Sequence, residues 1–214
     1  MLSSLYYSGL RASGITAAAR ALRAGGLVLC YHNVVQEQSD SGFPGTHLPF
    51  ASFSRQVRWL ARHYEIVSLG EFANSLEDRL PLQRVAAITF DDGYAGVFDH
   101  AWPLLRQMGL PATVFIPTDL MNREEGFWWD HPSVARETSD ASRHKMLFDL
   151  RGDGMAIAEN FFDRSRPKVP ATHRPVGWET VAHAAAEGLD LGVHTATHRN
   201  LNCVTDVEFV RELM

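Results

Sequence analysis

Two pairs of residues in this sequence have the types and spacing of a metal centre. Asp91 and Asp92 place two carboxylates side by side, immediately before Gly93. His194 and His198 have the H-x-x-x-H spacing, which on a helical turn puts two imidazoles on one face. Adjacent carboxylates need a partner for their charge, and a divalent cation is the simplest one. Two imidazoles and a carboxylate suit Zn²⁺ with one position open for water.

Hydrolysis of an amide or ester is the chemistry that such a centre supports. A divalent metal lowers the pKa of water and polarises a carbonyl oxygen, and a spare carboxylate can take the proton. An Asp-Asp-Gly tripeptide alone is more often a turn, and H-x-x-x-H alone is a moderate signal. Their combination at two strand ends is far more specific. Ordinary core or surface roles are expected for His63, His100, His144 and His183.

Short apolar runs alternate with helical patterns and place these residues. The predicted strands are 27–31, 85–90, 112–116 and 189–193, the first two with the character of strands buried on both faces. Asp91 follows the second run, and His194 follows the fourth. This alternation predicts a parallel α/β sheet or barrel, in which functional residues gather at the carboxyl ends of the strands.

Helices are predicted between the strands from apolar spacing, capping boxes and a glycine stop. The segments are 53–60, 69–76, one ending at Met108 before Gly109, 178–187 and one that follows Thr205. Capping boxes mark two of the starts, Ser68-Glu71 and Thr205-Glu208. The last helix begins an apolar face with Val207, Phe209 and Val210.

The stretch from about 119 to 175 is polar and breaks this rhythm, so we interpret it as an insertion over the barrel mouth. One helix is expected within it, near 144–150. Trp128 and Trp129 are expected to pack in a core rather than to stack on a sugar ring. The predicted organisation is a basic helical segment at 1–26 and one main domain at 27–214.

Composition narrows the class of protein. The chain has 214 residues, 45% of them hydrophobic, which fits one globular domain. A net charge of -5 without a Lys/Arg run argues against nucleic acid as a partner.

No signal-peptide core or membrane span is evident, which favours a cytoplasmic or membrane-peripheral location. Residues 15–22 suit a packed or frayed helix better than one with weak membrane-surface contact. Cys30 and Cys203 are expected to be reduced thiols.

Two motifs make the sequence similar to a known family. Thr89 to Tyr94 (TFDDGY) and His194 to His198 (HTATH) resemble the first two motifs of the NodB-homology polysaccharide deacetylases, carbohydrate esterase family four. The similarity extends from about residue 27 to the end, and includes Tyr31-His32, 112–116 and Trp178-Glu179. It implies a distorted, incompletely closed (β/α) barrel. It also implies a hydrolase that removes N-acetyl or O-acetyl groups from a saccharide or polysaccharide.

The resemblance also implies roles for single residues. Asp91 would be the general base, and Asp92, His194 and His198 would bind the metal, with Zn²⁺ favoured and Co²⁺, Ni²⁺ or Mn²⁺ as alternatives. Thr195 would brace the loop that presents the second histidine.

Two further residues keep alternative interpretations. His32 is as consistent with a contact to substrate or to the metal ligands as with a packed, hydrogen-bonded histidine. Tyr94 either touches the site or caps the following helix.

The chain departs from the family pattern in two ways. The two motifs lie farther apart than in compact members. The later motifs, which carry an arginine, an aromatic groove wall and the histidine that protonates the leaving amine, have no match before Met214. We therefore expect the last strands to be missing, and metal binding with little turnover.

Two other functions remain as alternatives. The first is a catalytically impaired metal-binding or saccharide-binding remnant of a deacetylase barrel. The second, Mg²⁺-dependent phosphoryl transfer, is disfavoured because no glycine-rich phosphate loop is present and imidazoles are poor Mg²⁺ ligands.

Overall fold

The computed structural model describes residues 25–37, 45–135, 137, 139–163 and 169–214. The basic helical segment predicted at 1–26, including the helix expected at 15–22, lies almost wholly outside the described residues. No helix in the described part of the chain is long and apolar enough to cross a membrane.

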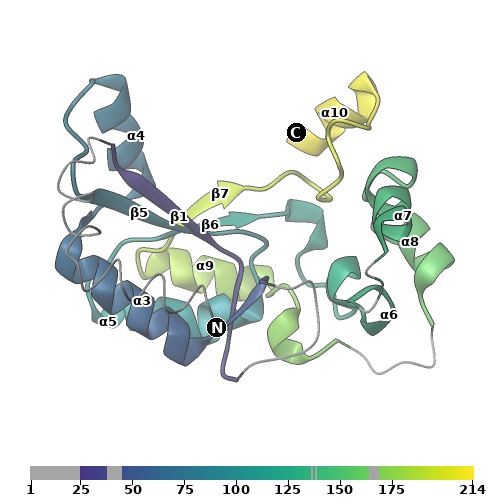
Figure 1. Ribbon diagram of the computed structural model, residues 1–214, viewed down its shortest axis with the longest axis horizontal. Coiled ribbons are helices and arrows are strands. Elements are labelled where there is room, and N and C mark those ends of the chain that lie inside the picture. Colours follow the sequence, from purple (N-terminus) through teal and green to yellow (C-terminus); the bar gives the residue numbers. More distant parts are fainter. Residues whose placement is uncertain (1–24, 38–44, 136, 138, 164–168) are drawn as a thin grey trace, which may run out of the picture.

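A parallel sheet forms the centre of the fold (Figure 1). Its strands are β1 (Leu27–Tyr31), β4 (Glu65–Ile66), β5 (Val85–Phe90), β6 (Thr113–Ile116) and β7 (Asp190–Val193). The order is β1-β5-β6-β7, and β4 pairs with the start of β5. The predicted strands and the α/β class are confirmed, and the described strands form an open sheet. Since all of them run parallel, the ends of β5 and β7 that carry the motifs lie at the same end of the sheet.

Helices occupy the positions expected from the apolar spacing and the capping boxes. They are α3 (Phe50–His63), α4 (Leu69–Glu77), α5 (Trp102–Gln107), α9 (Trp178–Ala186) and α10 (Asp206–Leu213). A π-helical turn, η1 (Val97–Ala101), precedes α5. Both predicted capping boxes are present at the starts of α4 and α10. Helices α3, α5 and α9 lie together on one side of the sheet (Figure 1).

The core lies between the sheet and these helices. The side chains predicted to face it from α3 are buried, namely Phe53, Val57 and Leu60. Strand β5 is buried along almost its whole length. The prediction that β1 is buried on both faces is wrong, because Val28 is 49% exposed and Cys30 is also exposed. Strand side chains alternate between faces, and Tyr31 packs on Phe53 of α3 whereas Val28 and Cys30 point to the opposite face.

Residues between β6 and α9 form several short elements. They are η2 (Thr118–Leu120), η3 (Trp128–Asp130), α6 (Pro132–Ala135), α7 (Asp140–His144), η4 (Lys145–Asp149), α8 (Gly154–Phe161) and η5 (Ala171–His173). The sequence predicted a single helix near 144–150. Element η4 lies there, but the other short helices were not predicted. Side-chain caps from Ser139 and Asp153 start α7 and α8, which are too short to show helical periodicity in the sequence. Whether this segment is an insertion remains a prediction.

The tryptophans of η3 are buried, as predicted. Trp128 is 9% exposed and Trp129 is 6% exposed, and both belong to the main core cluster. This segment is thus packed into the principal core rather than around a core of its own.

A small parallel sheet, β2 (Asn33–Val35) with β3 (His47–Pro49), packs against the start of η1. The close approach requires a glycine. A Cβ atom at Gly96 would lie 2.2 Å from the Val34 carbonyl oxygen and 2.4 Å from Asn33 Oδ1. No real Cβ contact is that short, so any side chain here has to push the small sheet away.

We expect Gly96→Ala to lower the free energy of unfolding by about 1–3 kcal/mol, because the added methyl group forces this backbone apart. Urea denaturation followed by circular dichroism measures the change. Gly70→Ala in α4 is the matched control, since nothing lies within 4 Å of its added Cβ. It should be neutral or stabilising by up to about 1 kcal/mol. Equal effects of the two substitutions would contradict this packing.

Candidate metal centre

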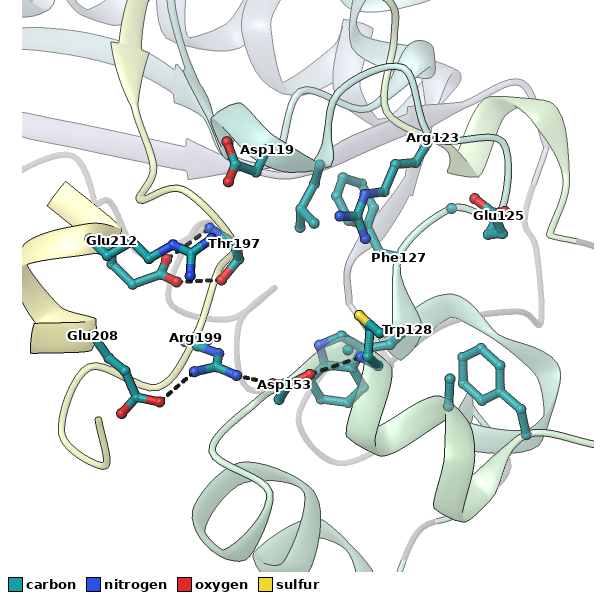
Figure 2. A pocket seen from close by; sticks show the side chains of 17 residues that line it. Asp119, Arg123, Glu125, Phe127, Trp128, Asp153, Thr197, Arg199, Glu208 and Glu212 are labelled. Carbon is teal, nitrogen blue, oxygen red and sulfur yellow. Dashed lines mark hydrogen bonds and ion pairs between the residues drawn. The ribbon is translucent and has the colours of Figure 1, made fainter. Parts of the chain in front are cut away.

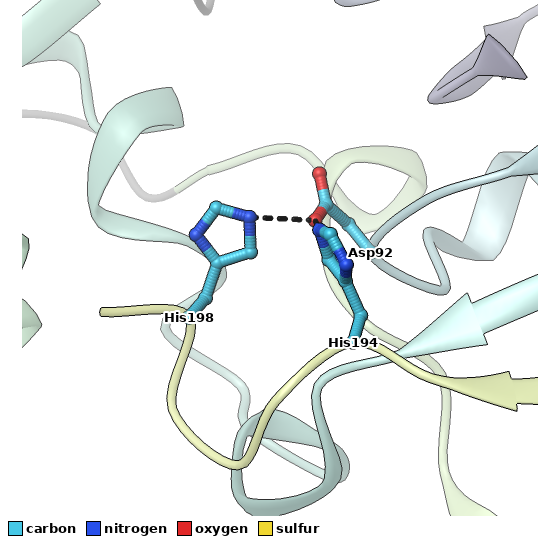
Figure 3. A group of neighbouring side chains, drawn as sticks. All are labelled: Asp92, His194 and His198. Atoms are coloured by element: carbon cyan, nitrogen blue, oxygen red, sulfur yellow. Dashed lines mark ion pairs between the residues drawn. The ribbon is translucent and has the colours of Figure 1, made fainter. Parts of the chain in front are cut away.

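Three side chains converge at the carboxyl end of the sheet, Asp92, His194 and His198 (Figure 3). The Nε2 atom of His198 lies 3.4 Å from Asp92 Oδ1, and that of His194 lies 3.7 Å from the same oxygen. One candidate ligand atom from each residue lies within 4.8 Å of the other two. In a tetrahedral zinc site, neighbouring ligand atoms are about 3.4 Å apart. The observed spacing is close to that of such a site.

The environment of Asp92 supplies a separate test of fit. The residue is 2% exposed, and its Oδ1 atom has no hydrogen-bond partner in the described part of the chain. A buried carboxylate oxygen without a donor is costly, and a cation would satisfy it. The residues present therefore suit a divalent metal ion.

Backbone geometry after β5 aims the two carboxylates. Asp92 and Gly93 both adopt left-handed conformations, with φ of 72° and 65°. These two residues turn the chain sharply, while the Asp91 N–H still donates to the Tyr31 carbonyl of β1 at 2.9 Å. Asp91 and Asp92 consequently diverge, and only Asp92 belongs to the three-residue cluster. The adjacent pair in the sequence thus becomes one buried candidate ligand, Asp92, and one carboxylate, Asp91, that lies outside the cluster.

The loop that carries the two histidines is not a helical turn, so the sequence interpretation of the H-x-x-x-H spacing was wrong. Thr195 and His198 have φ of 62° and 59°, which a right-handed helix excludes. The His194 N–H still donates to the Ile116 carbonyl at 2.9 Å, which extends the pairing of β6 with β7 by one residue. The Thr195 hydroxyl accepts a hydrogen bond from the His198 N–H at 3.0 Å. The imidazoles meet because the loop folds back on itself.

Glu212 of α10 holds this loop, a role that no pattern in the sequence indicated. Its carboxylate accepts from the Thr197 N–H at 2.8 Å and from the Thr197 hydroxyl (Figure 2). Its carbonyl oxygen accepts from the Ala196 N–H at 2.9 Å. Glu212 is only 5% exposed. The end of α10 therefore fixes the segment between the two histidines.

Helix α10 exposes the face that was expected to be buried. The apolar face predicted from Val207, Phe209 and Val210 is exposed, by 81%, 41% and 52%. Its buried side chain is the acidic Glu212 instead. Helical spacing identifies which residues share a face, but the partners of that face are set by the tertiary structure.

Burial controls the ionisation of the three candidate ligands. Burial first, and then the neighbouring Asp91 and Asp130, raise the pKa of Asp92 to about 8. Burial, and then His194, lower the pKa of His198 to about 4. Burial also lowers the pKa of His194. Each shift favours a neutral side chain, and a bound cation would convert the carboxyl into a carboxylate while keeping both imidazoles neutral.

Two residues at the end of β1 face the site. Cys30 Sγ donates to Asp91 Oδ2 at 3.1 Å, and burial followed by Asp91 raises the pKa of the thiol to about 12. His32, which is half-buried, contributes electrostatically to lowering the pKa of both His194 and His198. His32 is thus within electrostatic range of the candidate ligands, and both of its interpretations remain predictions. Both cysteines of the chain are free thiols.

Tyr94 directly precedes a helical segment, and its carbonyl oxygen accepts from the Val97 N–H at 3.0 Å, as expected of a residue that caps the following helix. It is fully buried, and its hydroxyl donates to Asp130 Oδ2 and accepts from Trp129 Nε1, both at 2.7 Å. The Trp129 ring in turn contacts His198, with ring centroids 4.6 Å apart. Trp129 thus links the Tyr94 hydroxyl to His198.

A cavity of about 920 Å³ lies beside the histidine loop (Figure 2). Thr197 lines it on one side, and Phe127 and Trp128 line it on another. Arg199 also lines it and pairs with Glu208 at 2.8 Å and with Asp153. The candidate ligands are not among its lining residues, so the cavity adjoins the metal centre without containing it.

The fold and the site together define an α/β protein with an Asp-His-His centre at the carboxyl ends of parallel strands. A family model described as polysaccharide deacetylase matches residues 79–214, which is more than half of the chain. This chain belongs to the polysaccharide deacetylase family, as its motifs predicted.

Curated relatives share parts of the sequence. The YxkH protein of Bacillus subtilis, named as a polysaccharide deacetylase, is 30% identical over 91 residues, 42% of this chain and 30% of that protein. The poly-beta-1,6-N-acetyl-D-glucosamine N-deacetylase of Escherichia coli is 28% identical over 111 residues, 51% of this chain and 15% of that protein. The chain therefore spans less than a third of the length of either relative.

Solved structures share the fold. IcaB from Ammonifex degensii aligns with a TM-score of 0.52 and 21% identity, over 81% of this chain and 55% of that chain. The Streptococcus pyogenes deacetylase PplD aligns with a TM-score of 0.55 and 15% identity, over 87% of this chain and 63% of that chain. At these identities, the likeness establishes the architecture.

Metal-free protein should lose stability as the pH rises from 6.5 to 8. The folded-state pKa of Asp92, about 8, exceeds the ordinary value of 3.8, so the folded state keeps a proton that the unfolded state has released. That stabilisation is complete below the unfolded pKa and is lost as the pH passes through the folded one. The lowered pKa values of His198, His194 and His173 act oppositely, mainly below the unfolded value of 6.5, so the carboxyl dominates the change in stability above 6.5.

The expected loss is about 2 kcal/mol across this window. Urea unfolding in the presence of a chelator, at several pH values, measures it. Asp92→Asn should remove the decline, because its amide does not titrate. A decline of the same size in that variant would show that another group is responsible.

Proposed function

We propose that this chain is a metal-dependent hydrolase that removes acetyl groups, N-acetyl before O-acetyl, from a saccharide or polysaccharide. The observation that carries the proposal is the meeting of Asp92, His194 and His198 beside a carboxylate, Asp91, that stays outside the ligand set. Membership of the polysaccharide deacetylase family supplies the reaction class.

Asp92, His194 and His198 would hold the metal ion. One carboxylate and two neutral imidazoles suit Zn²⁺ best, with Co²⁺, Ni²⁺ or Mn²⁺ as alternatives, whereas Mg²⁺ prefers oxygen ligands. When bound, the ion polarises the acetyl carbonyl and lowers the pKa of water at the site. The remaining steps fall to side chains of this chain.

Asp91 is the proposed general base. It lies between the end of β5 and Asp92, and the Cys30 thiol and its own backbone N–H tie it to β1. From there its carboxylate takes a proton from the water that attacks the acetyl carbonyl carbon. Cleavage of the carbon–nitrogen bond then yields acetate and a free amine, and the departing nitrogen requires a proton.

His32 is the proposed donor of that proton. It lies directly after β1, at the end of the sheet where the other site residues gather, and it interacts electrostatically with both histidine ligands. The sequence interpretation left the general acid without a residue. An imidazole is a suitable proton donor for this step, since it can carry and release a proton near neutral pH.

The first substrate to test is an oligomer of β-1,6-linked N-acetylglucosamine. The choice follows the name of the Escherichia coli relative, and it matches an amide as the bond cleaved. Oligomers with β-1,4 linkages serve as the comparison for linkage preference.

Asp91→Asn should lower the rate of acetate release by a factor of about 10²–10⁴ without loss of metal, because it removes the base and leaves the ligands. His198→Ala should lose both metal and activity. Acetate is measured by a coupled assay, and metal content by inductively coupled plasma mass spectrometry after reconstitution with Zn²⁺.

Each outcome has a distinct meaning. Acetate release at the native rate by His198→Ala would contradict the proposal. Near-stoichiometric metal in the native chain without release of acetate would assign it to the alternative function, a metal-binding or saccharide-binding remnant of a deacetylase.

His32→Gln should lower kcat by about 10²-fold or more, with little change in KM or metal content, if His32 protonates the leaving amine. Its effect should shrink on an activated aryl acetate, whose leaving group needs no proton. An equal loss on both substrates would instead indicate a structural role for His32.

A further inference from the structure

A chain of buried polar groups leads from the small sheet to the metal centre. Asn33 Nδ2 contacts His47 Nδ1 at 3.0 Å, and His47 Nε2 contacts Asp130 Oδ1 at 2.9 Å. Tyr94 and Trp129 continue the chain from the second Asp130 oxygen. Asn33 and Asp130 are both 0% exposed. Nothing in the proposed reaction uses these groups.

The donors and acceptors along this chain have one consistent arrangement. The Asn33 amide donates both to the Thr172 carbonyl and to His47 Nδ1, so that ring nitrogen acts as the acceptor. His47 Nε2–H then donates to Asp130, and the Tyr94 hydroxyl donates to the other Asp130 oxygen. Asp130 is therefore a buried carboxylate that accepts from two sides.

Tyr94 transmits this arrangement to the indole of Trp129. Its hydroxyl donates a hydrogen bond to Asp130, so its oxygen is free to accept a hydrogen bond from the Trp129 N–H. The indole is also stacked on Phe127, with centroids 4.7 Å apart and planes inclined by 5°. A hydrogen bond at its edge and a parallel ring on its face fix both the position and the tilt of Trp129.

His198 rests against this fixed indole, with ring centroids 4.6 Å apart and planes inclined by 46°. Its backbone is in a left-handed conformation on a loop, so the surrounding packing has to set the direction of the imidazole. A metal ligand has to be held within about 0.5 Å and 10–20° of its working geometry.

We propose that Asp130, acting through Tyr94 and Trp129, is a positioning residue that orients His198 for metal binding. The inference rests on the proposed function, in which His198 is a ligand. It goes beyond that function by assigning a role to the W-W-D segment and to the small β2-β3 sheet. Residues remote from the ion thereby determine how tightly the ion is held.

Tyr94→Phe is the sharpest test, because it removes one hydroxyl from a buried ring and keeps the shape of that ring. We expect it to weaken Zn²⁺ binding about 10–100-fold, the range typical for residues that orient metal ligands. Competition with a chromophoric chelator measures the Kd. The visible spectrum of the Co²⁺-substituted protein should change as well, since it reports the geometry of the ligands.

Tyr31→Phe is the matched control. It also deletes a hydrogen-bonded hydroxyl, one that donates to Gln56 of α3 at 3.1 Å, outside this polar chain. It should leave both the Kd and the Co²⁺ spectrum as in the native chain. Trp129→Phe serves as a second variant should Tyr94→Phe fail to fold, as judged by circular dichroism and the Tm.

A double-mutant cycle completes the test. Because Tyr94 acts through Trp129, the double variant should bind Zn²⁺ about as weakly as Trp129→Phe alone. Native Kd and spectrum in folded Tyr94→Phe and Trp129→Phe would overturn the inference. Absence of metal binding in the native chain would instead overturn the proposed function, so the two failures are distinguishable.

Discussion

The carboxylate of Asp92 imposes the main constraint on this molecule. It is nearly inaccessible to solvent, and one of its oxygens has no hydrogen-bond donor among the described residues. Two further carboxylates, Asp91 and Asp130, lie close enough to raise its pKa. Such a group is either protonated or bound to a cation. Two imidazoles that burial keeps neutral stand opposite it. A metal ion at this position would therefore replace the proton on the buried carboxyl group and bind imidazoles that are already neutral.

The parallel sheet is what allows these groups to meet. The motif after β5 and the motif after β7 are about a hundred residues apart in the chain, yet β6 lies between them in the sheet and pairs with both strands. Parallel strands bring their carboxyl ends to one place, and left-handed residues in each following loop turn the side chains inward. Regular structure supplies proximity, and irregular backbone supplies direction.

Two separate supports hold the loop that carries the two histidines. Glu212 binds its middle through backbone and side-chain hydrogen bonds, and Trp129 contacts His198 at its end. Both supports are buried, and both depend on carboxylates whose donors come from other segments of the chain. The geometry of the site therefore depends on α10 and on the segment before α9 as much as on the strands themselves.

The sequence by itself determined the strands, the main helices and their capping boxes, and the set Asp91, Asp92, His194 and His198, because local spacing and residue type are enough to specify them. Only the tertiary structure decided that the histidines lie on a loop, that Glu212 is the buried side chain of α10, and that Tyr94 bonds Asp130. A buried polar side chain is stabilised by partners that lie far away in the chain, and the periodicity of the sequence does not identify those partners. The same reason explains the wrong prediction for β1. Its run of apolar residues did not indicate that α3 covers only one face of the strand.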